Sequence, residues 1–348
     1  MDNFFIEFRD PLFGIIVFFL LIFVITFVSY WWGRYRFKRS SQDLDNFLQS
    51  FHSIETENDL TVLIKKGELS QKSWLLLANS YFKSADYDKS IEIYSEILKN
   101  SDPSSAQETM FLLGKTYFKA GFLERSKQMF LEILKHNPRT PEALEHLLLV
   151  YENLRDYKSA LEVLEPLQQL NEEISKDYNY IELLSIINNF KIKDEIKIAL
   201  ILEIYKKTDA LRYMIFEYLF RTDTKVAWEN LDIDKSESFI NILWLIDKKD
   251  LNFDIILQSD FLKELYTARG DIDIAKKSSI FELDILINLK KNANATLNFE
   301  YLCNSCQHSH PFAFNRCNYC HSIDTQIVEF SLTRDFYKNF NEENNSFQ

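Results

Sequence analysis

The sequence predicts an all-α protein that begins with a membrane helix and ends in a small metal module with short β-strands. Three observations support this fold class. The 348 residues include only six glycines and six prolines, fewer than strands and tight turns usually need. A pattern of large and small residues recurs at intervals of 34 and 36 residues, which is typical of stacked helical hairpins. All four cysteines fall between residues 303 and 320, in two closely spaced pairs.

The predicted membrane helix is residues 11–32, a run of 22 residues without a charged side chain. As a helix it would be about 33 Å long, enough to cross a hydrocarbon core of about 30 Å. A cleaved signal peptide is a poorer interpretation, because acidic residues precede the run and no small-residue cleavage site follows it. Four basic residues come directly after the run, and the positive-inside rule then predicts an outside N-terminus and a cytoplasmic body. They are Arg34, Arg36, Lys38 and Arg39.

Composition argues against several classes of function. The net charge is −12 although residues 1–40 are net basic, so the body is strongly acidic and we expect it not to bind nucleic acid. The glycines are too widely separated to form a P-loop or a dinucleotide-binding loop. Half of the histidines lie outside the cysteine region, and they have no serine or cysteine nucleophile motif beside them, so we expect no enzymatic activity. Clustered cysteines favour one metal site in a reducing compartment over a disulfide framework.

The repeat is clearest in the first half of the chain. Tyr81, Tyr117 and Tyr151 occupy equivalent positions in three units of large, small, aromatic and small residues. Small residues such as Gly114 let two helices approach closely, and aromatic residues fill the space between them. This pattern resembles the tetratricopeptide repeat, an antiparallel pair of helices that stacks into a solenoid.

Beyond residue 172 the pattern decays but helical periodicity continues. The step from Tyr266 to Ala275 equals the step from Tyr151 to Ala160, so we expect a further helical hairpin there. The predicted division of the chain is an N-terminal segment with the anchor (1–33), a basic linker with irregular helices (34–70), three clear repeats (71–172), degenerate helical repeats (173–298), the cysteine module (299–335) and a polar tail (336–348).

In a solenoid of this kind the first helix of each pair lines a concave groove that binds proteins. Repeat register therefore predicts which residues contact a partner. They are Lys72, Asn79, Phe82, Phe111, Lys115, Phe118, Glu145 and Glu152, with Leu149 among their apolar neighbours.

The cysteines form two Cys-x2-Cys pairs separated by ten residues: Cys303, Cys306, Cys317 and Cys320. Two such pairs supply the four thiolates of a tetrahedral zinc site, so we expect one zinc ion, with iron as the chemical alternative. With four thiolates present, His308, His310 and His321 are expected to lie on the surface and not to bind the metal.

The combination of anchor, repeats and cysteine module resembles the lipopolysaccharide assembly protein B family of Gram-negative bacteria. The resemblance is best over residues 107–167 and 301–334, although Gln307 stands where a glycine is usual and Asn318 where a proline is common. It implies a non-catalytic adaptor in the bacterial inner membrane, with its body on the cytoplasmic side. Such an adaptor regulates lipopolysaccharide synthesis by presenting the committed-step deacetylase to a membrane AAA+ protease, and its rubredoxin-like module packs on the repeats.

A second hypothesis is an electron-transfer protein. In that case the rubredoxin-like module would hold iron and the repeats would dock a redox partner. The metal content distinguishes the two hypotheses, since colourless protein with zinc supports the adaptor and red protein with iron supports electron transfer.

Overall fold

A computed structural model describes residues 70–100, 103–170, 173–208, 210–289 and 295–334, together with six residues between 20 and 28. The chain divides into two compact units, Met1–Leu154 and Arg155–Gln348. The six described residues between 20 and 28 are helical and exposed. The rest of the predicted anchor lies outside the described residues. So do residues 34–69 of the predicted linker and the predicted tail. In the described part of the chain, no helix has the length and apolarity that a membrane crossing requires.

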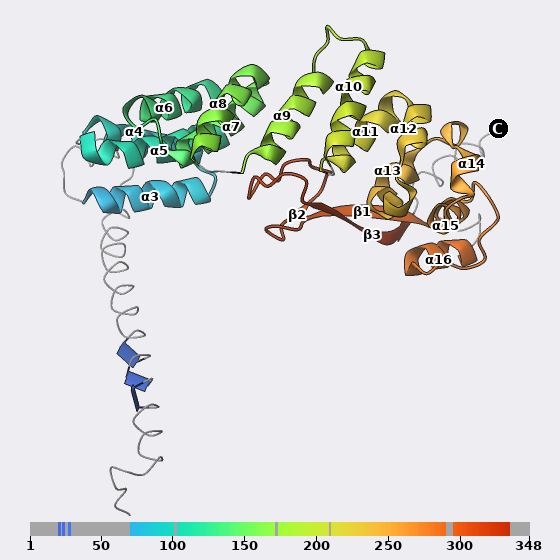
Figure 1. Ribbon diagram of the computed structural model, residues 1–348. Helices are drawn as coiled ribbons and strands as arrows, with labels where there is room; N and C mark the ends of the chain where they lie inside the picture. The colour runs from blue at the N-terminus through green and yellow to red at the C-terminus, as the bar shows by residue number, and fades with distance from the viewer. Residues whose placement is uncertain are drawn as a thin grey trace, which may run out of the picture. The chain divides into compact units, whose positions relative to one another are not determined.

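The first unit consists of antiparallel helices joined by short turns, as the repeat pattern predicts (Figure 1). Two complete hairpins are followed by the first helix of a third. The helices are α3 (Gln71–Lys83), α4 (Tyr87–Lys99), α5 (Pro103–Lys119), α6 (Leu123–His136) and α7 (Pro141–Leu154).

Local signals set the ends of these helices. The side chain of Ser70 accepts a hydrogen bond from the Ser73 amide at the start of α3, and Asp86 caps α4 in the same way. The turns between paired helices contain residues in the left-handed conformation, Ala85 with φ 62° and Gly121 with φ 83°. Ala85 and Gly121 are 36 positions apart, as are Tyr81 and Tyr117, so the turns repeat with the same interval as the first two units of the pattern.

The small residues between paired helices also make hydrogen bonds. The buried Ser90 hydroxyl donates to the Ala78 carbonyl at 3.0 Å, and the buried Ser126 hydroxyl donates to the Gly114 carbonyl at 2.8 Å. Each bond joins the second helix of a hairpin to the backbone of the first. These serines therefore do more than leave room for close approach, the role that the sequence pattern predicts for small residues between paired helices.

Gly114 is needed because the ring of Phe130 lies against its backbone. A Cβ atom at position 114 would come within 3.0 Å of two ring atoms of Phe130 and within 3.3 Å of Met129 Cβ. Phe130 is completely buried, so it has little room to move. The equivalent position in the first hairpin is Ala78, which is also fully buried.

We expect Gly114→Val to lower the free energy of unfolding by about 1–3 kcal/mol, because the added side chain overpacks the hairpin. Urea unfolding followed by circular dichroism measures the change. Gln128→Val is the matched control, since it introduces the same β-branched residue at an exposed position of α6. Adding Phe130→Leu to the Gly114→Val chain should restore part of the loss. Equal stability of Gly114→Val and the parent would show that the hairpin packing is described wrongly.

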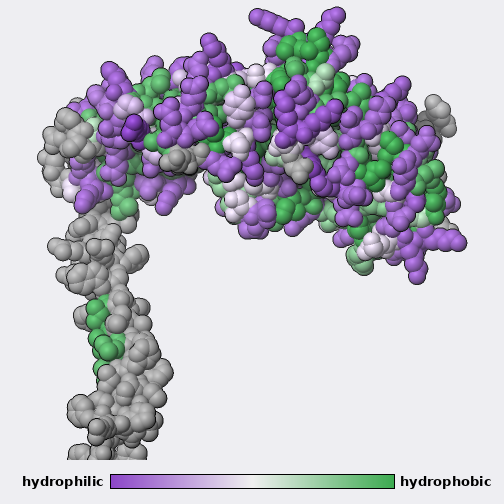
Figure 2. Space-filling model, in the orientation of Figure 1, coloured by the Kyte–Doolittle hydropathy of each residue, from purple (hydrophilic) through white to green (hydrophobic). Residues whose placement is uncertain are grey.

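The second unit begins with regular helices and continues with short ones. The long helices are α8 (Tyr157–Gln169), α9 (Ser175–Ile187), α10 (Asp194–Lys207) and α11 (Arg212–Thr222). The later elements are α12 (Thr224–Asn230), η1 (Ile233–Phe239), α13 (Ile240–Leu245), η2 (Lys248–Asp250), α14 (Phe253–Ile256), α15 (Asp260–Arg269) and α16 (Phe281–Leu289). On the face drawn in Figure 2, hydrophilic residues cover most of the helical surface, as expected when the apolar side of each helix is buried.

The second helix of the pair expected from the step between Tyr266 and Ala275 begins later than predicted, and Ala275 is not part of it. Gly270, with φ 84°, ends α15, and residues 271–280 are not helical. The amide of Ala275 donates instead to the Thr267 hydroxyl at 3.2 Å. The next helix is α16, which packs against α15 through its buried Leu283 and Leu286, so a helical pair does form, but its second helix begins at Phe281.

The chain ends in a three-stranded antiparallel sheet, β1 (Ala295–Cys303), β2 (Ser309–His310) and β3 (Gln326–Arg334), in the order β2-β1-β3. β1 and β3 contain nine residues each, so the expectation of short strands holds only for β2. The module also starts at residue 295, earlier than the predicted boundary at 299.

A buried polar cluster attaches this sheet to the helices of the same unit. The Asn241 amide, on α13, donates to the Tyr213 hydroxyl at 2.6 Å and to the Tyr301 hydroxyl at 3.2 Å. Burial raises the pKa of Tyr213 to about 12, so its hydroxyl keeps its proton at neutral pH. Nearby, the Leu211 amide donates to the Asp324 carboxylate at 2.9 Å. The metal module therefore packs on the helices that precede it.

Candidate functional site

Two similar backbone turns position the four cysteines. In each turn, the amide of the first cysteine, Cys303 or Cys317, donates to the carbonyl of the residue five positions later at 3.0 Å. The residue four positions later, Gln307 or His321, donates back to the carbonyl of that cysteine and has a φ near 60°. A non-glycine residue in this left-handed conformation costs about 1–2 kcal/mol, and both Gln307 and His321 adopt it. Cysteine spacing thus correctly predicts two equivalent knuckles.

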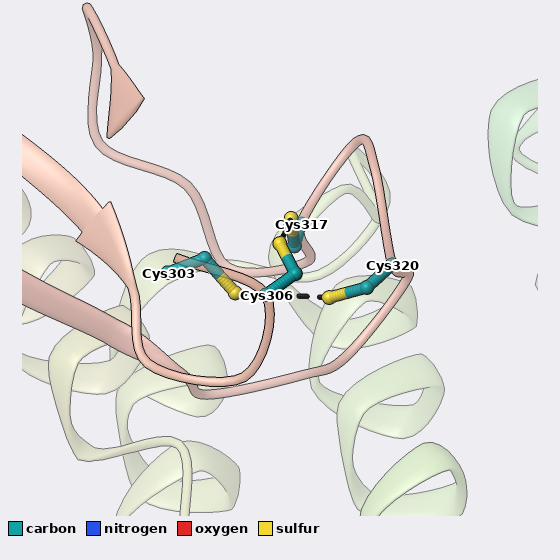
Figure 3. A group of neighbouring side chains, drawn as sticks. All are labelled: Cys303, Cys306, Cys317 and Cys320. Carbon is teal, nitrogen blue, oxygen red and sulfur yellow. Dashed lines mark hydrogen bonds between the residues drawn. The ribbon is translucent and has the colours of Figure 1, made fainter. Parts of the chain in front are cut away.

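The four sulfur atoms converge on one point (Figure 3). Cys303 Sγ lies 3.7 Å from Cys320 Sγ, and Cys306 Sγ lies 3.6 Å from Cys317 Sγ. All four sulfurs lie within 4.8 Å of one another. Four thiolates about 2.3 Å from a tetrahedral ion would be about 3.8 Å apart. The structure therefore fits a four-sulfur metal site, as the sequence predicts, and the same cage suits zinc and iron.

The cysteines differ in exposure. Cys303 and Cys317 are buried, Cys306 is partly exposed and Cys320 is exposed. Burial raises the pKa of Cys320, but its interactions with the Ser322 side chain and amide and with Cys306 and Cys303 outweigh this effect and lower the pKa to about 6.

Polar side chains lie within hydrogen-bond distance of three of the four sulfurs. The pairs are Thr325 Oγ1 with Cys303 at 3.3 Å, Ser322 Oγ with Cys320 at 3.3 Å and His310 Nε2 with Cys317 at 3.4 Å.

The three neighbouring histidines do not all lie on the surface as expected. His308 is exposed and His321 is half-buried, but His310 is only 6% exposed and contacts Cys317. The pairing of β2 with β1 causes this difference. His310 is opposite Tyr301, and directly paired residues of an antiparallel sheet lie on the same face. Since β1 side chains alternate, Tyr301 and Cys303 share that face too. Cysteine spacing alone contains no information on this register.

The second knuckle is joined to α9 by Arg316. One guanidinium nitrogen donates to Asp177 at 2.9 Å and another donates to the His321 carbonyl at 3.0 Å. The guanidinium also lies over the ring of Tyr180, 5.0 Å from its centroid. These residues are far apart in the sequence, so sequence analysis did not identify Arg316 or Asp177 as site residues.

The predicted partner-binding residues all lie on the first helices of the hairpins, as repeat register requires. Lys72 and Glu145 are exposed, whereas the other six are half-buried. By helix, Lys72, Asn79 and Phe82 are on α3, Phe111, Lys115 and Phe118 are on α5, and Glu145 and Glu152 are on α7. The neighbouring Leu149 is buried and therefore does not offer its side chain to a partner.

Phe111 packs within the repeat. Its ring lies 5.9 Å from that of Phe130 and 5.0 Å from the imidazole of His146, with Lys115 Nζ 5.6 Å from its centroid. Burial lowers the pKa of His146, and the ammonium groups of Lys115 and Lys119 act in the same direction. Lys115, which repeat register assigns to the partner-binding face, therefore also contacts the aromatic cluster of Phe111 and its neighbours. Repeat register did not identify His146 as a member of this cluster.

Comparisons with known proteins agree with the repeat. Residues 72–105 match the family model described as a tetratricopeptide repeat. The comparison with curated proteins gives no match. Among solved structures, the crystal structure of BtubC (BKLC) from P. vanneervenii is similar at 17% identity with a TM-score of 0.28, covering 69% of this chain and 93% of that chain. The family match and the helical hairpins together support tetratricopeptide repeats in the first unit, and the structure also has a possible four-cysteine metal site.

Proposed function

We propose that the protein is a non-catalytic adaptor that binds a partner protein through the first helices of its repeats, α3, α5 and α7. The tetratricopeptide match over residues 72–105 carries this proposal, because solenoids of this kind present extended surfaces for proteins. The exposed ends of Lys72 and Glu145 and the half-buried Lys115 and Phe118 supply charge and aromatic area on these helices. Aromatic side chains are frequent anchors of protein interfaces, and charged side chains around them contribute specificity.

In this proposal the metal module, with one zinc ion held by the four cysteines, acts as a brace. Contacts of Arg316 with Asp177, of Asp324 with Leu211 and of Tyr301 with Asn241 attach the module to helices of its own unit. Two of the four sulfurs are buried, which favours a structural site. Metal analysis of purified protein separates this role from electron transfer, which requires iron.

The resemblance to the lipopolysaccharide assembly protein B family suggests the biological setting. We propose a single-pass protein of the bacterial inner membrane, anchored by residues 11–32, with a periplasmic N-terminus and a cytoplasmic body. Its partners would be the committed-step deacetylase of lipid A synthesis and a membrane AAA+ protease, and its activity would regulate lipopolysaccharide synthesis through the lifetime of the deacetylase.

The double variant Lys115→Ala/Phe118→Ala tests the partner-binding face in the full chain. We expect binding of purified deacetylase to weaken about tenfold or more, equivalent to about 1.4 kcal/mol, and the deacetylase to persist longer in cells. Lys135→Ala/Leu131→Ala is the matched control, since it removes one lysine and one exposed apolar residue from α6 of the same hairpin.

Both double variants should keep the helix content of the parent and remain folded at the temperature of the binding assay. Equal binding by both variants would contradict the proposed face. A deacetylase that does not bind the parent chain would contradict the proposed partner and leave the face to be tested with another protein.

A further inference from the structure

We propose that His310 positions the Cys317 thiolate by donating a hydrogen bond from Nε2, and that this bond makes the metal site hold zinc more tightly. The two atoms are 3.4 Å apart, and both residues are buried. This inference does not depend on the proposed adaptor function, since it concerns only the metal module.

The direction of the bond follows from the chemistry of the site. A metal-binding cysteine has lost its proton and can only accept a hydrogen bond. The hydrogen between the two atoms must then belong to His310, whose imidazole therefore has its hydrogen on Nε2. A hydrogen bond to a buried charged sulfur is of the charge-assisted kind, which is stronger than a bond between neutral groups.

Cys317 needs such a donor more than the exposed Cys320 does. It is completely buried, so water cannot solvate its negative charge. Cys303, the other fully buried sulfur, has the Thr325 hydroxyl 3.3 Å away. Each completely buried thiolate thus has a side-chain donor, and for Cys317 that donor is His310.

Aromatic packing holds the imidazole in place. The His310 ring lies 4.2 Å from the Phe314 ring and 5.6 Å from that of Tyr319, between centroids. The backbone at His310 is fixed as well, because β2 pairs with β1 at Tyr301. Since the ring is already oriented, little conformational entropy is lost when the bond to sulfur forms.

The test compares two replacements in the full chain. His310→Phe keeps an aromatic ring but has no N–H group, whereas His310→Gln has a side-chain nitrogen that can reach the place of Nε2. Chelator competition measures the zinc dissociation constant of each. We expect His310→Phe to bind zinc about 10- to 100-fold more weakly, as is usual on loss of an outer hydrogen-bond partner of a metal ligand. His310→Gln should recover most of that loss.

Cobalt substitution supplies a second measurement. The sulfur-to-cobalt charge-transfer absorption should show four sulfur ligands in the parent and in both variants, with a shifted band in His310→Phe because the donor to one sulfur is gone. His308→Ala is the control, since it removes an exposed histidine of the same module.

Three outcomes would overturn the proposal. Parental zinc affinity in His310→Phe would show that the bond has no effect on the metal. Equal weakening in His310→Phe and His310→Gln would show that the imidazole matters in some way other than by N–H donation. A parent spectrum with fewer than four sulfur ligands would point to His310 as a direct ligand.

Discussion

Cys317→Ser should abolish stable zinc binding and unfold the metal module, residues 295–334. The change removes one of four converging sulfurs, and loss of a ligand should weaken binding by more than the about 10–100-fold typical of an outer partner. Metal binding and folding are coupled in small modules of this kind, because the unfolded chain has no preformed site. Zinc content per chain after dialysis against a chelator, and hydrogen exchange across β1 and β3, measure the two effects.

The rest of the protein should respond differently. The hairpins of α3 to α7 belong to the other compact unit, so their helix content should stay at the parental value. Ser331→Ala, at an exposed position of β3, is the control and should retain zinc. If Cys317→Ser keeps parental zinc affinity, the four-cysteine site is wrong. If it loses zinc but regulates its target in cells as the parent does, the proposed brace is not needed for function.

Arg316→Met should lower the free energy of unfolding of the second unit by about 2–3 kcal/mol. The guanidinium side chain is 11% exposed and Asp177 is 27% exposed, so solvent only partly screens their ion pair. Hydrogen bonds to charged groups contribute about 1.5–3 kcal/mol each, and the contact with the Tyr180 ring adds to this. Methionine keeps the length and apolar character of the stem, so the loss reports on the guanidinium. Thermal and denaturant unfolding of zinc-loaded protein measure it.

A double-mutant cycle isolates the ion pair. Arg316→Met and Asp177→Asn, alone and together, should show a coupling of about 1–2 kcal/mol, whereas independent sites add to within about 0.5 kcal/mol. Arg316→Lys should restore only part of the stability, because the compact ammonium group lacks the planar guanidinium that bonds Asp177 and the His321 carbonyl while it lies over the Tyr180 ring. Arg334→Met, at the exposed end of β3, is the control. Simple additivity in the cycle would contradict the role of this pair in docking.

The features that could be predicted from the sequence are those set over short stretches of chain. The hairpins of the first unit follow from a local pattern of large and small residues, and the two cysteine knuckles follow from a spacing of three positions. When the residues that contact one another in a turn or hairpin lie within about 40 positions, all of them can be found in one segment of sequence. Gly114 could be selected in this way, since its neighbour Phe130 belongs to the next helix of the same hairpin.

Only the tertiary structure decided how the metal module is attached and which side chains surround its sulfurs. Asp177 and Arg316 meet although 139 positions separate them, and Leu211 and Asp324 meet across 113. His310 reaches Cys317 because of a strand register, and the helix that packs against α15 begins at Phe281 although the spacing of Tyr266 and Ala275 predicts an earlier start. Pairings over such distances depend on the packing of many side chains at once and not on any local pattern. The sequence therefore determined the repeats and the metal ligands, while packing determined the brace and the hydrogen bonds that support it.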